Sequence, residues 1–335
     1  LATALEAEAC EIYTDVPGVL TTDPRKVKDA QLMHTISCDE MLELASLGAA
    51  VLHPRAVEIA RNYGVPIVVK SSWSDEEGTK LTSKIRRPIG KDGLELGKPI
   101  DGLELVEDQV VFGLSHIPHQ PGVAASLFER LSKELVNVDL IIQSTHEGKS
   151  NDIAFTISKQ DLIKSKNVCQ ELIQEIGGKL SVQENMTKLS IRGAGIMGRP
   201  GIAAKLFGNL SRGGINLRLI ATSEVKVSCV IDEKFGAKAL RSVSEAFELN
   251  EDQIQTNPQI VNTQDPEVRG VAMDTDQEQL SVVKVPDKPG TAASLFSLLA
   301  DKGISVDTIV QSERVHDNGS RDISFTLKKD ARLSA

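Results

Sequence analysis

The feature that most constrains the fold of this 335-residue chain is an internal repeat. Residues 121–144 and 289–312 align without a gap and are identical at 13 of 24 positions. Residues 200–223 form a more distant copy of the same length. The copies start 79 and 89 residues apart (200 − 121 and 289 − 200), a spacing too long for a solenoid repeat and typical of a small domain. The sequence therefore predicts three related modules.

Each copy begins with an alternating apolar segment, which predicts a strand, followed by a Pro-Gly step and an amphipathic helix. A β-branched strand and a hairpin strand come next, and the first two copies add a helix at about 160–176 and 234–247. This order predicts an α+β ferredoxin-like sandwich with helices on one face of an antiparallel sheet. The third copy ends after its third strand and is incomplete. The predicted strands are Val110–Ile117, Val138–Ser144 and Asp152–Ile157; Leu189–Ala194, Ile215–Thr222 and Lys226–Ile231; Leu280–Val285, Ile304–Gln311 and Asp322–Leu327.

The Pro-Gly step has two explanations. Pro fixes φ at the helix start, and Gly, which has no Cβ, lets a ligand or a neighbouring strand approach the backbone. The free N–H groups and positive dipole end of the helix would then suit a carboxylate. A tight strand-to-helix connection explains the same dipeptide equally well. Three copies do not separate the two explanations, because a shared fold repeats its turns.

Residues Gly193–Gly198 fit the G-x-G-x-x-G pattern of dinucleotide sites, between a predicted strand and a helix. The equivalent segments of the other two copies lack these glycines. In addition, the second strand of the module leads into a hairpin and not into a parallel crossover. An NAD-binding oxidoreductase is the alternative that this pattern offers.

Composition excludes several classes of function. With 38 Lys+Arg and 47 Asp+Glu the net charge is 38 − 47 = −9, and aromatic residues make up 3%, so a nucleic-acid surface is not expected. No apolar run approaches the ~20 residues of a membrane helix. The four cysteines are far apart and in no ligand-like spacing, which predicts no metal site and reduced thiols in the cytoplasm. They are Cys10, Cys38, Cys169 and Cys229.

The segment before the repeats predicts an α/β layer. Strands at 10–16 and 66–72 alternate with two helices, the second beginning at His53 and capped at its end by Gly64. A loop at the end of the first strand lies where such sheets bind ligands. A solvated loop with Asx turns is the alternative. The polar residues of this loop are Thr14, Asp15, Asp23 and Arg25.

At this point the sequence resembles a known family. The run TDVPGVLTTDPRKV at 14–27, continued by ISCDEMLELASLGAAVLHPRAVEIARNYGVPIVVKSSW at 36–73, closely resembles the last third of the aspartate kinase catalytic domain. The repeats resemble the ACT regulatory domains that follow it, with PDKPG, GINL…ATSEVKVSCV and AFEL as family-like stretches. A third repeat resembles the cyanobacterial-type enzyme, which has four ACT units.

The resemblance implies an α/β C-terminal part of an amino-acid-kinase fold, followed by α+β ferredoxin-like ACT domains. The boundaries it implies are 1–82 for the kinase part, 83–108 for a linker, 109–186 and 187–262 for two ACT domains, and 270–335 for a truncated third.

The resemblance also implies an ATP site. Thr14-Asp15 and Arg25 fall where the family contacts ATP, and Ala50-Val51 fall where the family has Lys-Val. Leu20 stands where many members have a Tyr near the nucleotide, which changes the packing against the adenine or ribose. Ala50 replaces a nucleotide-contacting Lys, so that interaction must be weaker or supplied elsewhere. The implied ATP-binding residues are Thr14, Asp15, Leu20, Arg25, Ala50 and Val51.

For the intact protein the resemblance implies transfer of the γ-phosphoryl group of ATP, with Mg²⁺, to the β-carboxylate of L-aspartate, the first step of lysine, threonine and methionine biosynthesis. The family's Lys-Phe-Gly-Gly-Thr-Ser phosphate loop, its Ser-Asp-Thr segment and its aspartate-binding Arg do not occur in these residues. The chain starts at Leu1 within a helix-like stretch and stops just after a strand-like one, so we expect a piece of a longer protein. These 335 residues alone are expected to retain no catalytic residue and to lack kinase activity.

ACT modules imply an amino-acid sensor, with lysine and threonine as effectors bound between paired modules. A free amino acid needs N–H donors for its carboxylate and acceptors for its ammonium group. In the second copy Thr222 and Arg218 replace the Gln and Asp of the other copies, so this copy is expected to pair sheet-to-sheet with a neighbour and to form a wall of the site. The alternative is that these polar residues are only polar groups at strand ends and residues that form turns, with no ligand. The candidate effector residues are Asp287, Pro289, Gly290, Thr291, Ala292 and Gln311; Gly122, Val123, Ala124, Asp139 and Gln143; and Thr222, Ser223 and Glu224.

A second function, from a different class, is a stand-alone amino-acid-binding regulatory subunit without catalysis. A homo-oligomer is expected, because ACT sheets of the family tend to pair edge to edge and edge strands need covering. Neither a nucleic acid nor a membrane is expected as a partner.

Overall fold

The computed structural model of the chain describes residues 1–46, 51–83, 99–146, 150–194, 196, 199–258, 268–311 and 318–329. By its internal contacts the chain divides into two compact units. The first unit holds residues 1–101 together with 193–197 and 260–277, and the second holds 102–192, 198–259 and 278–335. The predicted fold class is confirmed: an α/β part is followed by three α+β modules.

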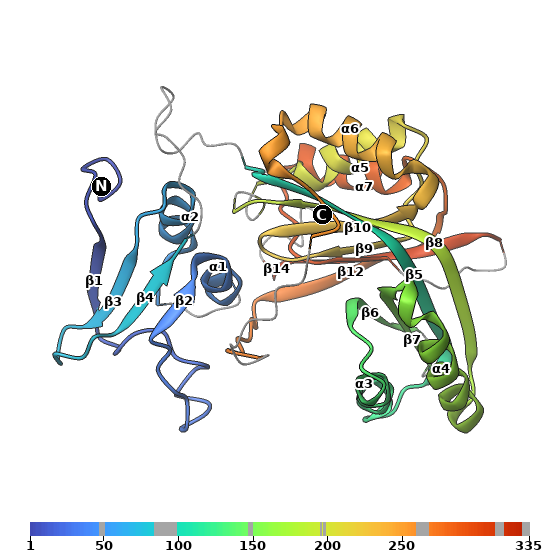
Figure 1. The fold of residues 1–335 in the computed structure, drawn as a ribbon, viewed down its shortest axis with the longest axis horizontal. Coiled ribbons are helices and arrows are strands. Elements are labelled where there is room, and N and C mark those ends of the chain that lie inside the picture. Colours follow the sequence, from blue (N-terminus) through green and yellow to red (C-terminus); the bar gives the residue numbers. More distant parts are fainter. Residues whose placement is uncertain are drawn as a thin grey trace. The chain divides into compact units, whose positions relative to one another are not determined.

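The first unit is built on a four-stranded sheet with the order β1-β3-β4-β2 (Figure 1). Strands β1 and β3 run parallel, with Cys10 opposite Ile67 and Thr14 opposite Ser71, whereas β3 and β4 are antiparallel. The carboxyl ends of β1 and β3 therefore meet at one edge, where the Ser72 N–H donates to the Thr14 carbonyl at 2.7 Å. Ligands of α/β sheets bind at such edges. The strands are β1 (Cys10–Thr14), β2 (Thr35–Ser37), β3 (Ile67–Ser71) and β4 (Thr79–Thr82).

Two helices, α1 (Cys38–Ser46) and α2 (Pro54–Tyr63), belong to this unit. The Nδ1 atom of His53 accepts the Arg55 N–H at 3.1 Å, and Gly64 ends α2 with φ 69°, so the predicted start and cap of this helix are confirmed. Helix α1 begins with a capping box, because the Ser37 hydroxyl accepts the Glu40 N–H and the Glu40 carboxylate accepts the Ser37 N–H.

The first module has the predicted strand-helix-strand-strand-helix-strand order, and its strands lie in the order β6-β7-β5-β8 of a ferredoxin-like sheet. Leu127 and Leu131 of α3 are buried in its core, where the rings of Phe112 and Phe155 stack at 5.4 Å between centroids. The second helix predicted at about 160–176 is confirmed as α4. The elements are β5 (Gly102–Pro118), α3 (Val123–Lys133), β6 (Val138–His146), β7 (Ser150–Ser158), η1 (Lys159–Asp161), α4 (Leu162–Ile176) and β8 (Lys179–Arg192).

The second module continues the same seven-stranded sheet, because β5 and β8 are long enough to serve both modules. The first residues of β5 lie between β8 and β11: Gly102 pairs with Arg192 in an antiparallel ladder, and Leu103 pairs with Ile254 in a parallel one. Residues 102–108, predicted as the end of a linker, are therefore part of β5. The other elements are α5 (Ile202–Arg212), β9 (Leu219–Thr222), β10 (Lys226–Asp232), η2 (Glu233–Phe235), α6 (Gly236–Phe247), η3 (Glu251–Gln253) and β11 (Ile254–Thr256).

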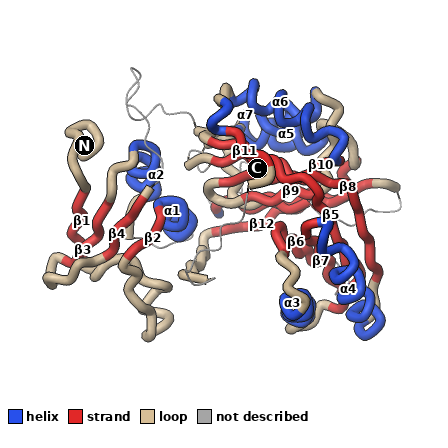
Figure 2. The backbone as a smooth tube through the Cα atoms, viewed as in Figure 1, coloured by secondary structure: helices blue, strands red, loops and turns tan. Residues whose placement is uncertain are grey.

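The third module is a three-stranded sheet, β12-β14-β13, with helix α7. Figures 1 and 2 show α5, α6 and α7 together on one side of their strands. Helices α5 and α7 pack on each other through Phe207 and Phe296, whose ring centroids are 5.7 Å apart. The elements are β12 (Gln277–Pro286), α7 (Thr291–Asp301), β13 (Ile309–Gln311) and β14 (Ser320–Lys328). The domain boundaries of the sequence analysis otherwise stay predictions.

Two predicted strands are shorter in the structure. Strand β9 begins at Leu219 and β13 at Ile309, whereas starts at residues 215 and 304 were expected. In the third module the Thr308 N–H donates to the Thr326 hydroxyl at 3.1 Å, so a side chain replaces a backbone acceptor of the ladder. The periodicity of apolar residues does not predict where a side-chain hydroxyl takes the place of a backbone acceptor.

In the structure, backbone conformation explains the glycine of each Pro-Gly step. Gly122, Gly201 and Gly290 precede their helices with φ of 93°, 96° and 100°, where a residue with a Cβ is strained. A Cβ on Gly290 would also lie 2.9 Å from the Ser211 hydroxyl oxygen of the second module, whereas one on Gly122 would meet nothing within 4 Å. The turn therefore requires glycine in all three copies, and close approach adds to that requirement in the third.

None of the described helices is long and apolar enough to cross a membrane. The four cysteines are free thiols. Burial raises the pKa of Cys38 to about 11 and those of Cys169 and Cys229 to about 12, so these three thiols stay protonated and unreactive at neutral pH.

Candidate functional sites

The first unit contains a cavity of about 440 Å³ at the carboxyl end of β1. This volume lies within the range of small-molecule sites. Five of the six residues that the resemblance assigns to ATP line it: Thr14, Asp15, Leu20, Arg25 and Val51. The sixth, Ala50, lies outside the described residues.

The polar side chains of this cavity are held by short-range hydrogen bonds. The Thr14 hydroxyl donates to the Asp15 carboxylate at 3.0 Å. The Arg25 guanidinium donates to both oxygens of Asp23, at 3.0 and 3.1 Å, and this hydrogen bonding holds the pKa of Asp23 below its usual value. Because the Arg25 side chain is 86% exposed, it is free to turn toward an anionic ligand without leaving a buried charge behind.

One side of this cavity was not predicted from the sequence. Val271, Ala272 and Met273, from the chain between the second and third modules, are among the lining residues. The Val271 N–H donates to the Thr21 carbonyl at 2.8 Å. The apolar stretch GVAM was the one local signal in this segment, and no local pattern connects residue 271 with residue 21.

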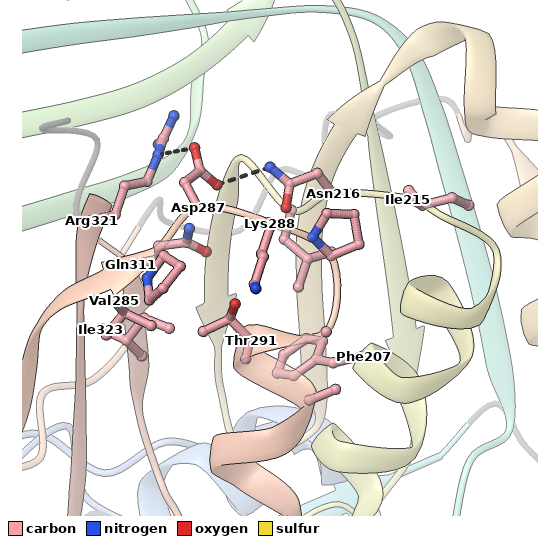
Figure 3. A pocket seen from close by; sticks show the side chains of 16 residues that line it. Phe207, Ile215, Asn216, Val285, Asp287, Lys288, Thr291, Gln311, Arg321 and Ile323 are labelled. Atoms are coloured by element: carbon pink, nitrogen blue, oxygen red, sulfur yellow. Dashed lines mark hydrogen bonds and ion pairs between the residues drawn. The ribbon is translucent and has the colours of Figure 1, made fainter. Parts of the chain in front are cut away.

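A second cavity lies in the other unit, between the second and third modules (Figure 3). Its volume is only about 20 Å³, which is enough for one water molecule. The third module contributes all six of its predicted effector residues, and the second module contributes residues that were not predicted as part of a site. The predicted lining residues are Asp287, Pro289, Gly290, Thr291, Ala292 and Gln311, and those of the second module are Phe207, Ile215, Asn216 and Leu217.

Asp287, predicted as an acceptor for an ammonium group, already has two partners. One carboxylate oxygen accepts Nε of Arg321 at 2.8 Å and the other accepts Nδ2 of Asn216 at 2.8 Å (Figure 3). The Arg321 side chain is 3% exposed, so this is a buried ion pair. Sequence reasoning missed Arg321 because it lies on β14, more than thirty residues beyond the Pro-Gly step.

Gln311 and Thr291 differ from Asp287. The side-chain oxygens Oε1 of Gln311 and Oγ1 of Thr291 are buried and have no hydrogen-bond partner among the described residues. A buried polar atom without a partner costs free energy, so each such atom calls for water or a ligand. Both line the small cavity.

The expected wall residues Thr222, Ser223 and Glu224 are not among those that line this cavity. The Thr222 hydroxyl instead donates to the Asp307 carbonyl at 3.1 Å and accepts the Ile309 N–H at 2.8 Å, so a side chain links the second module to the third. The predicted sheet-to-sheet pairing of the second copy stays a prediction, because β9 and β13 belong to different sheets. The wall itself comes from the second module's residues 215–217 and from α5.

In the first module the predicted acceptors lie in a different environment. Asp139 forms an ion pair with Lys188, and Gln143 is exposed. Gly122 caps α3, which begins at Val123 and continues with Ala124. These residues therefore lack the enclosure that surrounds Gln311.

The G-x-G-x-x-G pattern has a packing explanation at its first position. A Cβ on Gly193 would lie 2.1 Å from the Pro99 carbonyl oxygen, so glycine is required there by the chain itself. Gly195, Met197 and Gly198 lie outside the described residues.

Comparison with known proteins decides the family. Residues 1–71 match the amino acid kinase family, residues 115–172 and 189–247 match one ACT domain family, and 279–334 match another. The aspartokinase of Thermus thermophilus is 40% identical over 252 residues, and aspartokinase 2 of Bacillus subtilis is 41% identical over 257 residues. The chain belongs to the aspartokinase family.

Among solved structures, the crystal structure of the aspartate kinase from Synechocystis is similar to almost the whole chain. It is 49% identical, with a TM-score of 0.87, and the match covers 99% of this chain and 58% of that one. The two curated aspartokinases are each covered over 60% of their length, by 75% of this chain. The chain thus spans about three fifths of the aspartokinases it matches.

Proposed function

We propose that this chain works as part of an aspartate kinase, which transfers the γ-phosphoryl group of ATP to the β-carboxylate of L-aspartate. The observation that carries the proposal is the convergence of Thr14, Asp15 and Arg25 on one cavity at the carboxyl edge of a parallel strand pair. A guanidinium, a hydroxyl and a carboxylate at such an edge suit a nucleotide phosphate and its metal ion.

The residues present also fit Mg²⁺ brought by the nucleotide. Mg²⁺ keeps several waters and is usually held by one or two carboxylates together with substrate phosphates. Asp15 and Asp23 line the cavity and could supply a carboxylate, and within the described part of the chain no cluster of three or more His, Cys, Asp or Glu forms a self-sufficient metal site. When bound, Mg²⁺ neutralises charge on the phosphates.

The test is acyl hydroxamate formation, which traps the acyl phosphate, by the natural full-length polypeptide that carries these residues. We expect ATP- and aspartate-dependent product, and an Arg25→Ala variant with a raised KM for ATP. Hydroxamate formation by the 335 residues alone would contradict the expectation that they lack activity. If the natural polypeptide has no phosphate-loop segment and forms no product, the stand-alone regulatory subunit replaces the kinase.

We further propose that the cavity between the second and third modules is a regulatory site for an amino-acid effector, lysine or threonine. Its support is two buried oxygens, on Gln311 and Thr291, that have no hydrogen-bond partner in the described part of the chain and lie beside the N-terminus of α7. The present volume of about 20 Å³ is far too small for an amino acid, so binding must widen the contact between the two modules. An effector that binds the widened arrangement better shifts the population toward it.

A cytoplasmic homo-oligomer completes the proposal. Strand β12 lies at the edge of its sheet and exposes Val282 and Val283, and an edge of this kind is commonly covered by another chain or segment. Calorimetric titration of the full-length protein with lysine and with threonine tests the regulatory site, and the absence of heat for both effectors would refute it.

A further inference from the structure

Residues Arg269–Met273, which we call the connecting segment, precede the third module yet are bound to the first unit. The Val271 N–H donates to the Thr21 carbonyl at 2.8 Å, next to Leu20 of the candidate nucleotide loop. Gly270 lies so close to Thr21 that an added Cβ would be 3.3 Å from the Thr21 carbonyl oxygen. The segment is therefore fixed to the loop that shapes the cavity.

Arg269 anchors the segment at its start. Its guanidinium donates to both carboxylate oxygens of Glu40, at 3.2 and 3.3 Å, and also to the Thr35 carbonyl. Glu40 is itself held by the backbone N–H and hydroxyl of Ser37, at 2.8 and 2.7 Å. Burial raises the pKa of Glu40, but the Ser37 hydrogen bonds and Arg269 more than offset this and hold the pKa below its usual value. The anchor is thus a charged pair at neutral pH.

The connecting segment presents apolar surface to the cavity. Val271 and Met273 both line it, and the two residues are 63% and 59% exposed. Large apolar groups that face an open cavity are typical of surface that a ligand covers. The loop after β1 supplies the polar groups of the same cavity, so the two segments together offer a charged part and an apolar part. A nucleotide has the same division between phosphates and base.

We propose that the connecting segment completes the nucleotide site, with Val271 and Met273 packing against the base. This inference rests on the proposed ATP site and names the segment that supplies the surface in contact with the base. Leu20 offers no aromatic ring for stacking, and the thioether of Met273 makes favourable contacts with flat rings. The part of the chain that joins the two regulatory modules is then also a determinant of nucleotide affinity.

The first experiment measures ATP binding by the full-length protein with Met273→Ala and Val271→Ala. We expect the Kd and the KM for ATP to rise about tenfold for Met273→Ala, because the variant loses about half of the free energy of burying a methionine side chain. The KM for aspartate should stay unchanged. Val268→Ala is the matched control: Val268 is 74% exposed, precedes the segment and does not line the cavity. Equal Kd values for all three variants and the unchanged protein would overturn the inference.

A second experiment identifies the contact directly, by photolabelling the full-length protein with 8-azido-ATP and digesting it with trypsin. Cleavage after Arg269 and Lys284 releases residues 270–284 as one peptide, and we expect label on it that excess ATP suppresses. Label confined to residues 1–25 would refute the inference and leave the ATP site standing. If the unchanged protein neither binds ATP nor takes up label, the proposed function itself fails.

Discussion

The first and third modules are the two copies that share 13 of 24 positions over the helix and the following strand, and one unusual backbone position recurs in both. His116 and Lys284 have φ of 59° and 58°, and their N–H groups donate to Asp152 at 3.0 Å and Asp322 at 2.8 Å. Even this strained position recurs with a different side chain. Similar local sequence thus reproduces the turn, its hydrogen bond and the helix that follows.

The same two copies differ in what surrounds their polar residues. At equivalent positions of their turns the first module has His119 hydrogen-bonded to Asn151, at 2.9 Å, and the third has the buried pair of Asp287 and Arg321. The second module packs against this turn of the third copy through residues 215–217 and α5. A repeated sequence thus determines the position of a polar residue in the turn, whereas the modules packed around that turn determine whether the residue is buried and which groups it binds.

The largest expected effect tests the buried pair. Asp287→Ala should destabilise β14 by about 3–5 kcal/mol, because it removes the carboxylate partner of a buried guanidinium, whereas His119→Ala should cost β7 about 1 kcal/mol. The free energy of opening, measured by hydrogen exchange of the β14 and β7 amides, gives both values. Equal losses in the two modules would contradict the difference between their turns.

The next effect tests the two helix-capping glycines. Both Gly122→Ala and Gly290→Ala place a Cβ at a residue with positive φ, which should lower the free energy of unfolding by about 1–2 kcal/mol. Gly290→Ala also brings that Cβ to 2.9 Å from Ser211, which adds about 1 kcal/mol of overpacking. In thermal unfolding of the full-length protein, the Tm of Gly290→Ala should be lower than the Tm of Gly122→Ala. In a Ser211→Gly background the two substitutions should cost the same, and a persisting gap would show that Ser211 is not its cause.

A third effect tests whether enclosure makes the site. Gln311 is 5% exposed and its Oε1 lacks a partner among the described residues, whereas Gln143 is exposed. Gln311→Ala should weaken effector binding about 10- to 100-fold, since a hydrogen bond to a charged ammonium is worth about 1.5–3 kcal/mol. Gln143→Ala should leave the calorimetric Kd unchanged. The assignment of Gln311 fails if both variants bind lysine and threonine as the unchanged protein does.

The smallest effect concerns a surface pair that holds α3 to α4 in the first module. Arg130 donates to both oxygens of Glu175, at 2.8 and 2.6 Å, and these hydrogen bonds lower the pKa of Glu175 from its usual 4.5. Because the folded-state pKa is depressed, the stabilisation is complete above pH 4.5 and is lost as the pH falls through the lowered value.

NMR titration of the Glu175 carboxyl carbon should therefore give a midpoint below 4.5, and Arg130→Gln should return the midpoint to the usual value. A midpoint that does not move in Arg130→Gln would mean that the contact with Arg130 does not govern the titration. Because this pair is exposed, we expect little change in the unfolding free energy of the variant.

Much of the local structure was predictable. The spacing of apolar residues identified α3, α4 and α6, the caps at His53 and Gly64 bounded α2, and the repeat gave the order of elements in each module. These features depend on interactions within a few residues or one turn, so the sequence carries them directly. The strand-end loop that lines the cavity of the first unit was predicted from the same rules, and its link to ATP rests on the family resemblance.

Long-range pairing was not predictable in this way. The insertion of residues 102–106 beside β8 joins residues about ninety positions apart, and the partnership of Asp287 with Arg321 depends on how β14 is placed. The contact of Val271 with Thr21 spans two hundred and fifty positions. No periodicity reports such contacts, because each depends on the packing of elements that are individually stable in many arrangements.

By itself, then, the sequence determined three modules of one kind, a preceding α/β layer, and the glycines and caps that end and begin their helices. The tertiary structure alone decided that β5 and β8 are shared by two modules, that Gln311 is enclosed while Gln143 is exposed, and that the connecting segment reaches the loop after β1. The physical reason is that backbone conformation follows from near neighbours, whereas burial and ion pairing follow from whichever surfaces the folded chain brings together.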